Sequence, residues 1–417
     1  MVHSKRQNLP AITGLRLFLA FLVVAFHAGG SDGTLRFASR PANLYFENLV
    51  ASGYVSVGFF FVLSGFVLSY GYDLSERWTR NQWKRFLVAR LARIYPVYVL
   101  ALFVSFPLAL LTMLKEPRHS ALENIATLIT TPLLIQSWFP RSSTMWNGPG
   151  WSLSAEIFFY LMFPFLGVFL WRLRRLWSAT FMLGIVWVVA MGMASGLSLY
   201  FAHDLWIDRA TVDPLRDTWN SVIKFDPAMH LPAFLAGILA ARIFLQLSSG
   251  TGILRAGRGI WLYAPAIIVE LLVLTHAPSI RYPLLHDGLL IPLHASIIIG
   301  LALGGLGLPR LLSNSFLVIL GQASYALYLL HVPIARYWNL TAKHVLHRNM
   351  FGMYWFCGYS MLCIVISCVT YIWVEEPARR KVLQRFGRPQ DDINALSRPH
   401  RSGLVSHPQT HGESKPK

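Results

Sequence analysis

Charged residues are scarce in this chain. Asp, Glu, Lys and Arg together make up 13% of the 417 residues, whereas soluble domains average about 25%. A soluble multidomain protein needs a more highly charged surface than this. The scarcity of charge, together with a hydrophobic fraction of 54%, therefore excludes that class and indicates a protein with many membrane-spanning helices.

Cysteine is also rare. Cys357, Cys363 and Cys368 make up the whole set, and all three fall within one apolar segment. Thiols placed in this way are typical of small buried hydrophobic residues, and the pattern excludes both a disulfide framework and a cysteine-based metal site. On sequence grounds we expect no metal.

Acidic residues are few in comparison with basic ones. The chain has 19 acidic and 37 basic residues, which gives a formal net charge of +18. Such an excess can indicate a nucleic-acid partner, but here the Lys and Arg residues lie in short loops between apolar runs. That placement is typical of membrane orientation and of contact with anionic lipid headgroups, so we expect membrane lipid as a partner and no nucleic acid.

Hydropathy predicts about ten membrane-spanning helices. We expect them near residues 11–28, 49–70, 96–114, 151–171, 178–201, 231–247, 260–276, 288–306, 315–335 and 352–374. Lys and Arg are concentrated in alternate loops, including residues 77–93 and 379–388, and this bias predicts that both termini are cytoplasmic. The predicted fold class is an all-α, polytopic transmembrane helix bundle.

The chain divides into two unequal parts. Residues 1–386 are predicted to form one transmembrane domain, whereas residues 387–417 are polar and typical of a disordered tail. Within the domain, residues 115–150 contain an apolar patch of about a dozen residues, which is too short to span a bilayer. We therefore expect a re-entrant or interfacial segment over the outer mouth of the bundle. The first apolar run contains Arg16 and His27, which favours a retained helix over a cleavable signal peptide.

Arg16 and His27 are the most informative residues of that first run. Eleven positions separate them, and eleven helical steps of about 100° return to within about 20° of the start, about 16 Å further along the axis. Ionisable residues inside a membrane helix are costly and mark functional sites. A snorkelling arginine and a histidine bonded to the backbone form the structural alternative, but two such residues on one face favour function.

Arg90 and Arg93 form a second candidate pair, just before the expected span at 96–114. Residues three apart lie on one side of a helix. Two guanidinium groups placed in this way can bind phosphate oxygens through paired hydrogen bonds. Ordinary anchoring by cytoplasmic basic residues is the alternative explanation.

The fourth expected span opens with an ionisable stripe. Ser152, Glu156 and Tyr160 are spaced four apart after Pro149 and Gly150, which mark a turn. Glu156 lies well inside the apolar span, so it needs a partner or it will be protonated. A purely structural ion pair is the alternative.

A second stripe lies in the ninth expected span. Ser324, Tyr328 and His331 follow at spacings of four and three and share one face. The stripe ends in a histidine at the outer side. A histidine satisfied by its own backbone is the alternative explanation.

Short motifs also follow one another along the chain in a definite order. They are Arg16-x10-His27, FFFVLSGF at 59–66, Arg90-x-x-Arg93 followed by Tyr95-Pro96, WSLSAE at 151–156, SYALYLLH at 324–331 and VEEP at 374–377. Each motif alone is weak, but the ordered set, which extends over residues 8–380, is specific. It resembles the membrane acyltransferase-3 family of integral membrane O-acyltransferases.

The resemblance implies an enzyme that moves an acyl group, most often acetyl, from acyl-CoA to a hydroxyl of a surface carbohydrate or another acceptor. It also implies a multi-pass protein of the bacterial inner membrane, with acyl-CoA as the donor and no metal. The characteristic residues of the family correspond here to Arg16, His27, Arg90 and Arg93. Some relatives add an esterase-like outer domain, which we do not expect in this chain.

A division of roles follows from this hypothesis. Arg16, Arg90 and Arg93 would bind the CoA phosphates from the cytoplasmic side. His27 would act as general base on the acceptor hydroxyl or would accept the acyl group itself, and the sequence leaves both open. Glu156 would orient His27 and stabilise its charged form.

The remaining candidates are assigned to substrate contact. His331, as a third catalytic candidate, and Tyr328 would polarise the thioester carbonyl or bind the sugar, and Ser152 and Trp151 complete the predicted substrate-binding set. A proton-coupled transporter or flippase is the main alternative function, because it too would hold buried Arg, His and Glu. No internal repeat supports that alternative, and a sensor would not require the paired Arg and His.

Overall fold

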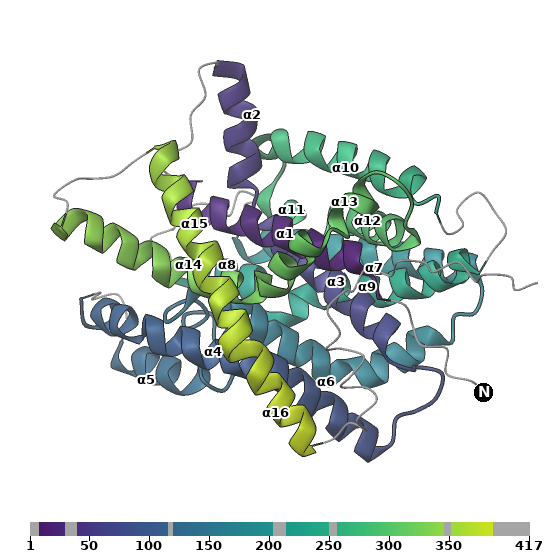
Figure 1. Ribbon diagram of the computed structural model, residues 1–417, viewed down its shortest axis with the longest axis horizontal. Coiled ribbons are helices and arrows are strands. Elements are labelled where there is room, and N and C mark those ends of the chain that lie inside the picture. Colours follow the sequence, from purple (N-terminus) through teal and green to yellow (C-terminus); the bar gives the residue numbers. More distant parts are fainter. Residues whose placement is uncertain are drawn as a thin grey trace, which may run out of the picture.

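Helices dominate the computed structural model, which describes residues 8–29, 40–115, 120–202, 214–249, 257–345 and 352–386. These ranges contain no strand, and the helices pack into one bundle (Figure 1). The predicted all-α fold class is confirmed. The expected polar tail lies outside the described residues, so the two-part division of the chain stays a prediction.

The helices differ widely in length, from five residues to 36. The α-helices are α1 Pro10–Gly29, α2 Arg40–Ala51, α3 Val55–Gly71, α4 Arg80–Lys115, α5 Ala121–Thr130, α6 Trp151–Trp171, α7 Leu176–Leu197, α8 Pro214–Phe225, α9 Pro227–Ser248, α10 Ile260–Thr275, α11 Tyr282–Asp287, α12 Ile291–Leu303, α13 Leu308–Leu312, α14 Ser315–Val345, α15 Met353–Thr370 and α16 Glu376–Phe386. Short 3₁₀ turns occur at η1 Gln136–Trp138, η2 Gly148–Gly150 and η4 Ala277–Ser279, and π-helical turns occur at η3 Ser198–Ala202 and η5 Tyr371–Glu375.

All of the expected spans coincide with helices. Within the described ranges, eight helices are long and apolar enough to cross a membrane, by length and composition, and α2 with α3 forms a ninth candidate that is bent by 49°. The remaining expected span is α10, whose 16 residues rise about 24 Å, less than the hydrocarbon thickness of about 30 Å. The membrane side of each terminus stays a prediction.

Two close helix crossings form the centre of the bundle, α1 against α14 and α3 against α9. A Cβ atom added at Gly65 of α3 would lie 2.1 Å from the carbonyl oxygen of Phe234 in α9. A Cβ at Gly321 of α14 would lie 2.0 Å from the carbonyl oxygen of Thr13 in α1. Glycine at these positions lets the backbones touch, which is how membrane helices associate without a hydrophobic driving force.

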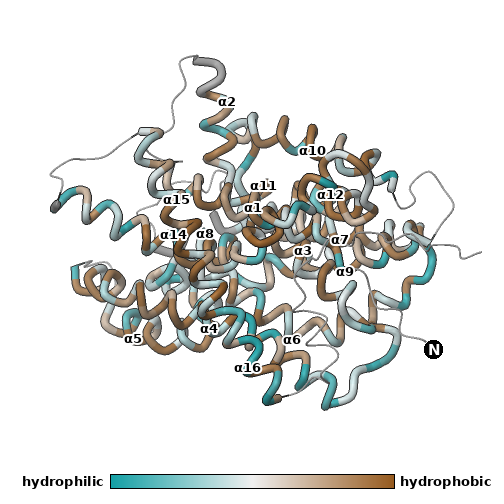
Figure 2. Tube along the Cα trace, in the orientation of Figure 1, coloured by the Kyte–Doolittle hydropathy of each residue, from teal (hydrophilic) through white to brown (hydrophobic). Residues whose placement is uncertain are grey.

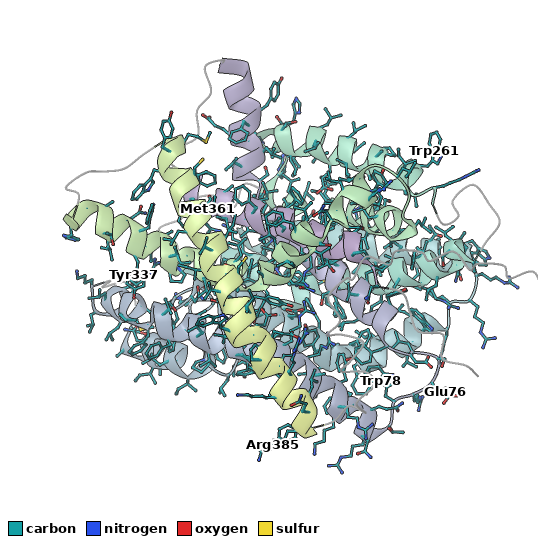
Figure 3. The ribbon with its side chains drawn as sticks, viewed as in Figure 1. Glu76, Trp78, Trp261, Tyr337, Met361 and Arg385 are labelled. Carbon is teal, nitrogen blue, oxygen red and sulfur yellow. The ribbon has the colours of Figure 1, made fainter. Side chains whose placement is uncertain are left out.

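The basic segments gather on one side of the fold. Helix α4 is 36 residues long, about 54 Å, so it exceeds a bilayer core and its basic first turns extend beyond the apolar part. Helix α16 packs along it and is the most hydrophilic helix in view (Figure 2). Arg385, near the end of α16, lies in the same lower part of the view as Glu76 and Trp78, which precede α4 (Figure 3). Whether these segments face the cytoplasm stays a prediction.

The stretch between α4 and α6 forms a short helix and turns rather than a span. Helix α5 has ten residues and begins with a capping box formed by Ser120 and Glu123. Its apolar side chains face outward, with Leu122 76% exposed. Arg141 donates a 2.9 Å hydrogen bond to Glu123, and this bond is the main reason that the pKa of Glu123 is lowered. The exposed apolar face fits the interfacial placement that we expect for this segment.

Candidate active site

One pocket collects most of the predicted site residues at the junction of α1, α3, α4, α6 and α14. We call it the central pocket. Its polar lining residues are Arg16, Ser64, Arg90, Arg93, Ser152, Glu156, Tyr160, Ser324, Tyr325 and Tyr328, and apolar side chains of α3 complete the wall. Residues that were predicted to share a helix face, such as Ser152 with Glu156 and Arg90 with Arg93, therefore do line the same pocket.

Three arginines give the central pocket its charge. Arg90 donates a 3.0 Å hydrogen bond to the hydroxyl of Tyr72 and lies against the ring of Tyr72, 5.4 Å from its centroid. Among the described residues, Arg16 and Arg93 have no hydrogen-bond or ion-pair partner, and they repel each other. Guanidinium groups bind planar anions through paired hydrogen bonds. The pocket is therefore built to receive an anionic group.

Glu156 belongs to this basic pocket. Its Oε1 atom accepts a 3.1 Å hydrogen bond from Ser64 and a 2.5 Å bond from Tyr160, one turn further along α6. The carboxylate also interacts electrostatically with Arg16. Within the described chain Glu156 makes no hydrogen bond to His27, so the geometry gives it a place among the arginines instead of the orienting role that the sequence suggested.

The start of α6 is fixed by the turns before it. Pro149 and Gly150 form the 3₁₀ turn that the sequence predicted, and α6 follows directly at Trp151. The hydroxyls of Ser152 and Tyr328 lie 2.8 Å apart, and they lie 3.0 and 3.2 Å from the carbonyl oxygen of Pro149. One hydroxyl can donate to the other while that one donates to Pro149. Ser152 and Tyr328 are therefore tied together in the pocket wall, where α6 meets α14.

His27 and His331 form a pair beside this wall. His331 Nε2 lies 3.2 Å from His27 Nδ1, and the ring centroids are 4.9 Å apart. His331 is buried, whereas His27 is exposed. The Tyr359 hydroxyl donates a 2.9 Å hydrogen bond to the carbonyl oxygen of His331. This bond fixes that turn of α14.

Nearby backbone carbonyl oxygens indicate which ring nitrogen of each histidine carries its proton. The carbonyl oxygen of Tyr328 lies 2.7 Å from His331 Nδ1, so the proton of a neutral His331 is on Nδ1 and its Nε2 is an acceptor. His27 Nδ1 lies 3.0 Å from the carbonyl oxygen of Val23 and faces that acceptor Nε2, so His27 also carries its proton on Nδ1. The Nε2 lone pair of His27 is then available to take a proton or to attack a carbonyl.

The histidine pair and the central pocket are two parts of one arrangement. Tyr328 lines the pocket through its side chain and accepts from His331 through its carbonyl oxygen. Arg16 and His27 lie on the face of α1 that packs against α14, with the arginine in the pocket and the histidine in the pair. Their common face is confirmed, and the spacing sets them about 16 Å apart along the helix axis.

Other residues are placed differently from the sequence expectation, or were missed. Trp151 does not line the central pocket; its ring packs against His230, 5.0 Å between centroids, and against Phe61. Ser64 and Tyr72 were missed as functional neighbours of Glu156 and Arg90. Their contacts join positions 92 and 18 residues apart, and no helical spacing signals contacts of that kind.

The fold is a bundle of apolar helices, and its central pocket collects three arginines and a glutamate beside a pair of histidines. The family model described as "Acyltransferase domain", acyltransferase 3, matches residues 9–375. The chain belongs to this family and is a membrane acyltransferase, which decides against the transporter alternative.

Named relatives agree with this assignment. The chain is 29% identical over 347 residues to acyltransferase MdmB of Streptomyces mycarofaciens, and the match covers 79% of this chain and 80% of that protein. It is 23% identical over 399 residues to O-acetyltransferase OatA of Staphylococcus aureus, covering 91% of this chain but 58% of OatA. A 65-residue stretch is 49% identical to protein 2 in the picA locus of Rhizobium radiobacter, covering 15% of this chain and 33% of that protein. No solved structure matches.

Proposed function

We propose that this chain transfers an acyl group, acetyl in the first instance, from acyl-CoA at the cytoplasmic face to a carbohydrate hydroxyl on the outer side of a bacterial plasma membrane. The observation that carries the proposal is the combination of two groups. Arg16 of α1 and Arg93 of α4 line the pocket and make no hydrogen bond or ion pair among the described residues, and an oriented imidazole pair joins α1 to α14. The arginines supply a site for an anionic donor, and His27 supplies a base.

The donor fits the central pocket by charge. CoA carries several phosphate groups, and phosphate oxygens are strong acceptors for guanidinium. Arg90 is held by Tyr72, so its position is set before a ligand binds. Arg16 and Arg93 would gain hydrogen bonds and lose their mutual repulsion when phosphate enters. The thioester end would then extend along α1 toward His27.

The orientation of His27 supports a balanced transfer step. Nε2 of His27 accepts the proton of the acceptor hydroxyl while the hydroxyl oxygen forms a bond to the thioester carbonyl carbon. The carbon–sulfur bond then breaks, and the imidazolium returns its proton to the departing sulfur. In the second route, Nε2 bonds to the carbonyl carbon and the carbon–sulfur bond breaks to release the CoA thiolate. The acceptor hydroxyl then attacks the acyl-imidazole, which frees Nε2, and the hydroxyl proton passes to the thiolate. The free Nε2 lone pair serves both routes.

The neighbours of His27 have distinct parts in this proposal. His331 accepts from Nδ1 of His27 and so takes the orienting position that hydrolase triads give to a carboxylate. Glu156 balances charge among the arginines and positions Tyr160. Tyr328 and Ser152 lie between the pocket and the pair, where their hydroxyls are candidates for contact with the thioester carbonyl or the sugar.

The nature of the acceptor rests on family likeness. One relative is named an O-acetyltransferase, which supports a hydroxyl acceptor, but this chain spans only 58% of that relative. The predicted topology places His27 toward the outer side, where a surface carbohydrate is accessible. The basic α4 and α16 segments lie together, in agreement with a cytoplasmic side for the donor.

Labelled donor tests the proposal directly. The purified chain is incubated in vesicles with acetyl-CoA labelled in the acetyl group and with a candidate glycan. We expect labelled glycan and free CoA in equal amounts, and neither product with His27→Ala. Free CoA without labelled glycan would contradict the proposed acceptor. Label that appears on the glycan only when a different acyl donor replaces acyl-CoA would contradict the proposed donor.

A further inference from the structure

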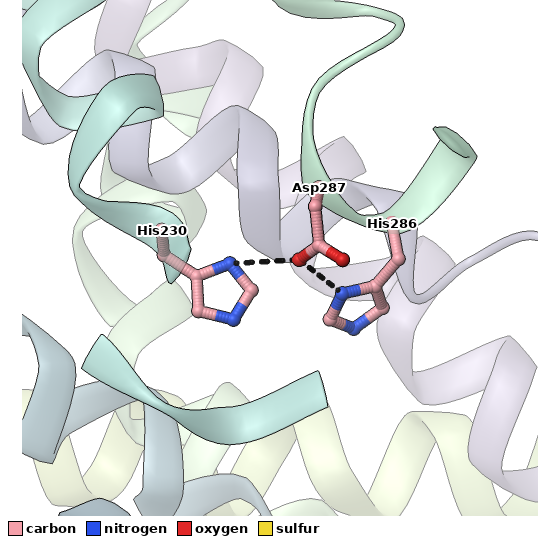
Figure 4. Close-up of side chains that lie close together, drawn as sticks. All are labelled: His230, His286 and Asp287. Carbon is pink, nitrogen blue, oxygen red and sulfur yellow. Dashed lines mark hydrogen bonds and ion pairs between the residues drawn. The ribbon is translucent and has the colours of Figure 1, made fainter. Parts of the chain in front are cut away.

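A second polar cluster lies within the bundle, away from the central pocket. His230 of α9 and the neighbouring residues His286 and Asp287 of α11 face one another (Figure 4). Asp287 Oδ1 lies 3.0 Å from His286 Nδ1 and 3.6 Å from His230 Nδ1. The side chains are 6%, 3% and 0% exposed for His286, His230 and Asp287. We call these three residues the His–Asp cluster.

The ring of His230 is oriented from its other side. Its Nε2 lies 3.1 Å from the carbonyl oxygen of Lys224, so the proton of a neutral His230 is on Nε2. The lone pair of Nδ1 then faces the carboxylate of Asp287. Two lone pairs that face each other in a buried site require a cation between them. A metal-binding histidine typically donates its second N–H to a backbone carbonyl in this way.

The carboxylate has unused capacity as a ligand. Asp287 Oδ2 is buried and has no hydrogen-bond partner among the described residues, and such an atom is costly to leave unpaired. All three side chains line one small cavity, together with Gly58 of α3. One potential ligand atom from each residue lies within 4.8 Å of the others, which is close enough for all three to contact a single ion.

A nearby lysine also contributes positive charge to the surroundings of the cluster. The Lys224 ammonium lies 4.7 Å from the centroid of the Tyr282 ring and interacts electrostatically with Asp287 and His286. This charge opposes a proton and a metal ion alike, so the arrangement of the ligand atoms has to distinguish between them. A proton on one imidazole would satisfy that ring alone, whereas a metal ion would use the lone pairs of both rings and of the carboxylate.

We propose that His230, His286 and Asp287 bind one zinc ion. Two imidazoles and a carboxylate form a ligand set that zinc favours, and a three-ligand site leaves a fourth position for water. This inference is independent of the proposed function and departs from the sequence expectation of no metal.

The position of the His–Asp cluster gives such an ion a structural role. The ring of Phe61 lies 5.2 Å from that of His230, and Phe61 also lines the central pocket. Trp151, at the start of α6, packs against both His230 and His286. An ion that joins α9 to α11 would therefore stabilise the position of Phe61 in the wall of the central pocket.

Metal analysis of the full chain tests the site. The protein is purified in detergent, incubated with zinc sulfate alone, desalted and analysed by mass spectrometry for metal content. We expect about one zinc per wild-type chain and its loss in Asp287→Asn and His230→Asn. His276→Ala, which changes an exposed histidine at the end of α10, should retain the metal. Wild-type protein without bound zinc, or equal retention by Asp287→Asn, would overturn the proposal.

Cobalt provides a second measurement that does not depend on how the variants fold. Wild-type protein loaded with Co²⁺ should show the visible absorption of a four-coordinate site with nitrogen and oxygen ligands, and added zinc should remove it. A spectrum of hexa-aqua cobalt that zinc does not change would show that the cluster is a hydrogen-bonded network holding protons, and would overturn the inference.

Discussion

The central pocket and the His–Asp cluster both involve Phe61, which lines the pocket and packs against His230, yet they are built in different ways. The pocket gathers three arginines around the carboxylate of Glu156. The cluster gathers two imidazoles around a buried carboxylate. Under the two proposals, the pocket binds an anion and the cluster binds a cation. One bundle would then hold two ligand sites of opposite charge whose surroundings share Phe61.

The largest expected effect is a loss of acyl transfer that leaves the His–Asp cluster unchanged. His27→Ala removes the base, and loss of a general base lowers the rate by about 10²–10⁴-fold. We expect the initial rate of labelled acyl transfer to fall within this range, with unchanged helical circular dichroism and unchanged zinc content. His276→Ala is the control, since that histidine is exposed on α10. Transfer by His27→Ala at the wild-type rate would remove His27 from the mechanism.

The next effect tests the anion site. Arg93→Gln removes a charged donor, and a hydrogen bond to a charged group contributes about 1.5–3 kcal/mol, so the KM for acyl-CoA should rise by about 10- to 100-fold. Arg310→Gln is the matched control, because Arg310 is an exposed arginine of α13 outside the pocket. A fall in kcat at unchanged KM would show that Arg93 acts on the reaction step and not on donor binding.

Substitutions of Glu156 and His331 should change different kinetic quantities, the KM for acyl-CoA and the pH dependence of kcat. Because Glu156 bonds to Ser64 and Tyr160, Glu156→Gln should change the KM for acyl-CoA by about tenfold, equivalent to about 1.4 kcal/mol. The pH dependence of kcat should stay as in the wild type. His331→Gln should instead change that pH dependence. If the two variants exchange these effects, the orienting role returns to Glu156, as the sequence suggested.

Removal of the metal tests the proposed zinc site in the His–Asp cluster. A ligand at 100 times its dissociation constant stabilises the folded state by about 2.7 kcal/mol, so a zinc chelator should lower the apparent Tm by about 5 °C. The same chelator should leave the Tm of Asp287→Asn unchanged, since that variant has no metal to lose. An equal shift in both proteins would place the effect of the chelator elsewhere.

The smallest expected effect comes from the exposed ion pair of Arg141 and Glu123. It is the baseline against which the larger effects are compared. Arg141→Ala should destabilise the protein by less than about 1 kcal/mol. Because Arg141 lowers the pKa of Glu123 below its ordinary value of 4.5, this stability is present above pH 4.5 and is lost as pH falls through the folded pKa. The difference in apparent Tm from the wild type should therefore be seen at pH 7 and vanish in acid. A difference that persists in acid would mean that Arg141 acts through packing.

Helical periodicity explains how much of the site could be predicted. Arg16 with His27, Arg90 with Arg93, and Ser152 with Glu156 each lie on one helix, so their spacing fixes their common face. The sequence could not show which helix each face would meet. That is why Glu156 was paired with His27 in the prediction and with Ser64 and Tyr160 in the structure.

The sequence by itself determined the membrane class, the approximate positions of the ten expected spans and the family, because apolar length and local spacing are properties of single segments. Only the tertiary structure brought His331 to His27, and His230 to the neighbouring pair His286 and Asp287. Those contacts depend on how close two helix backbones can approach, as at Gly65 and Gly321. Interhelical packing places residues from distant segments side by side, and no spacing along the chain records it.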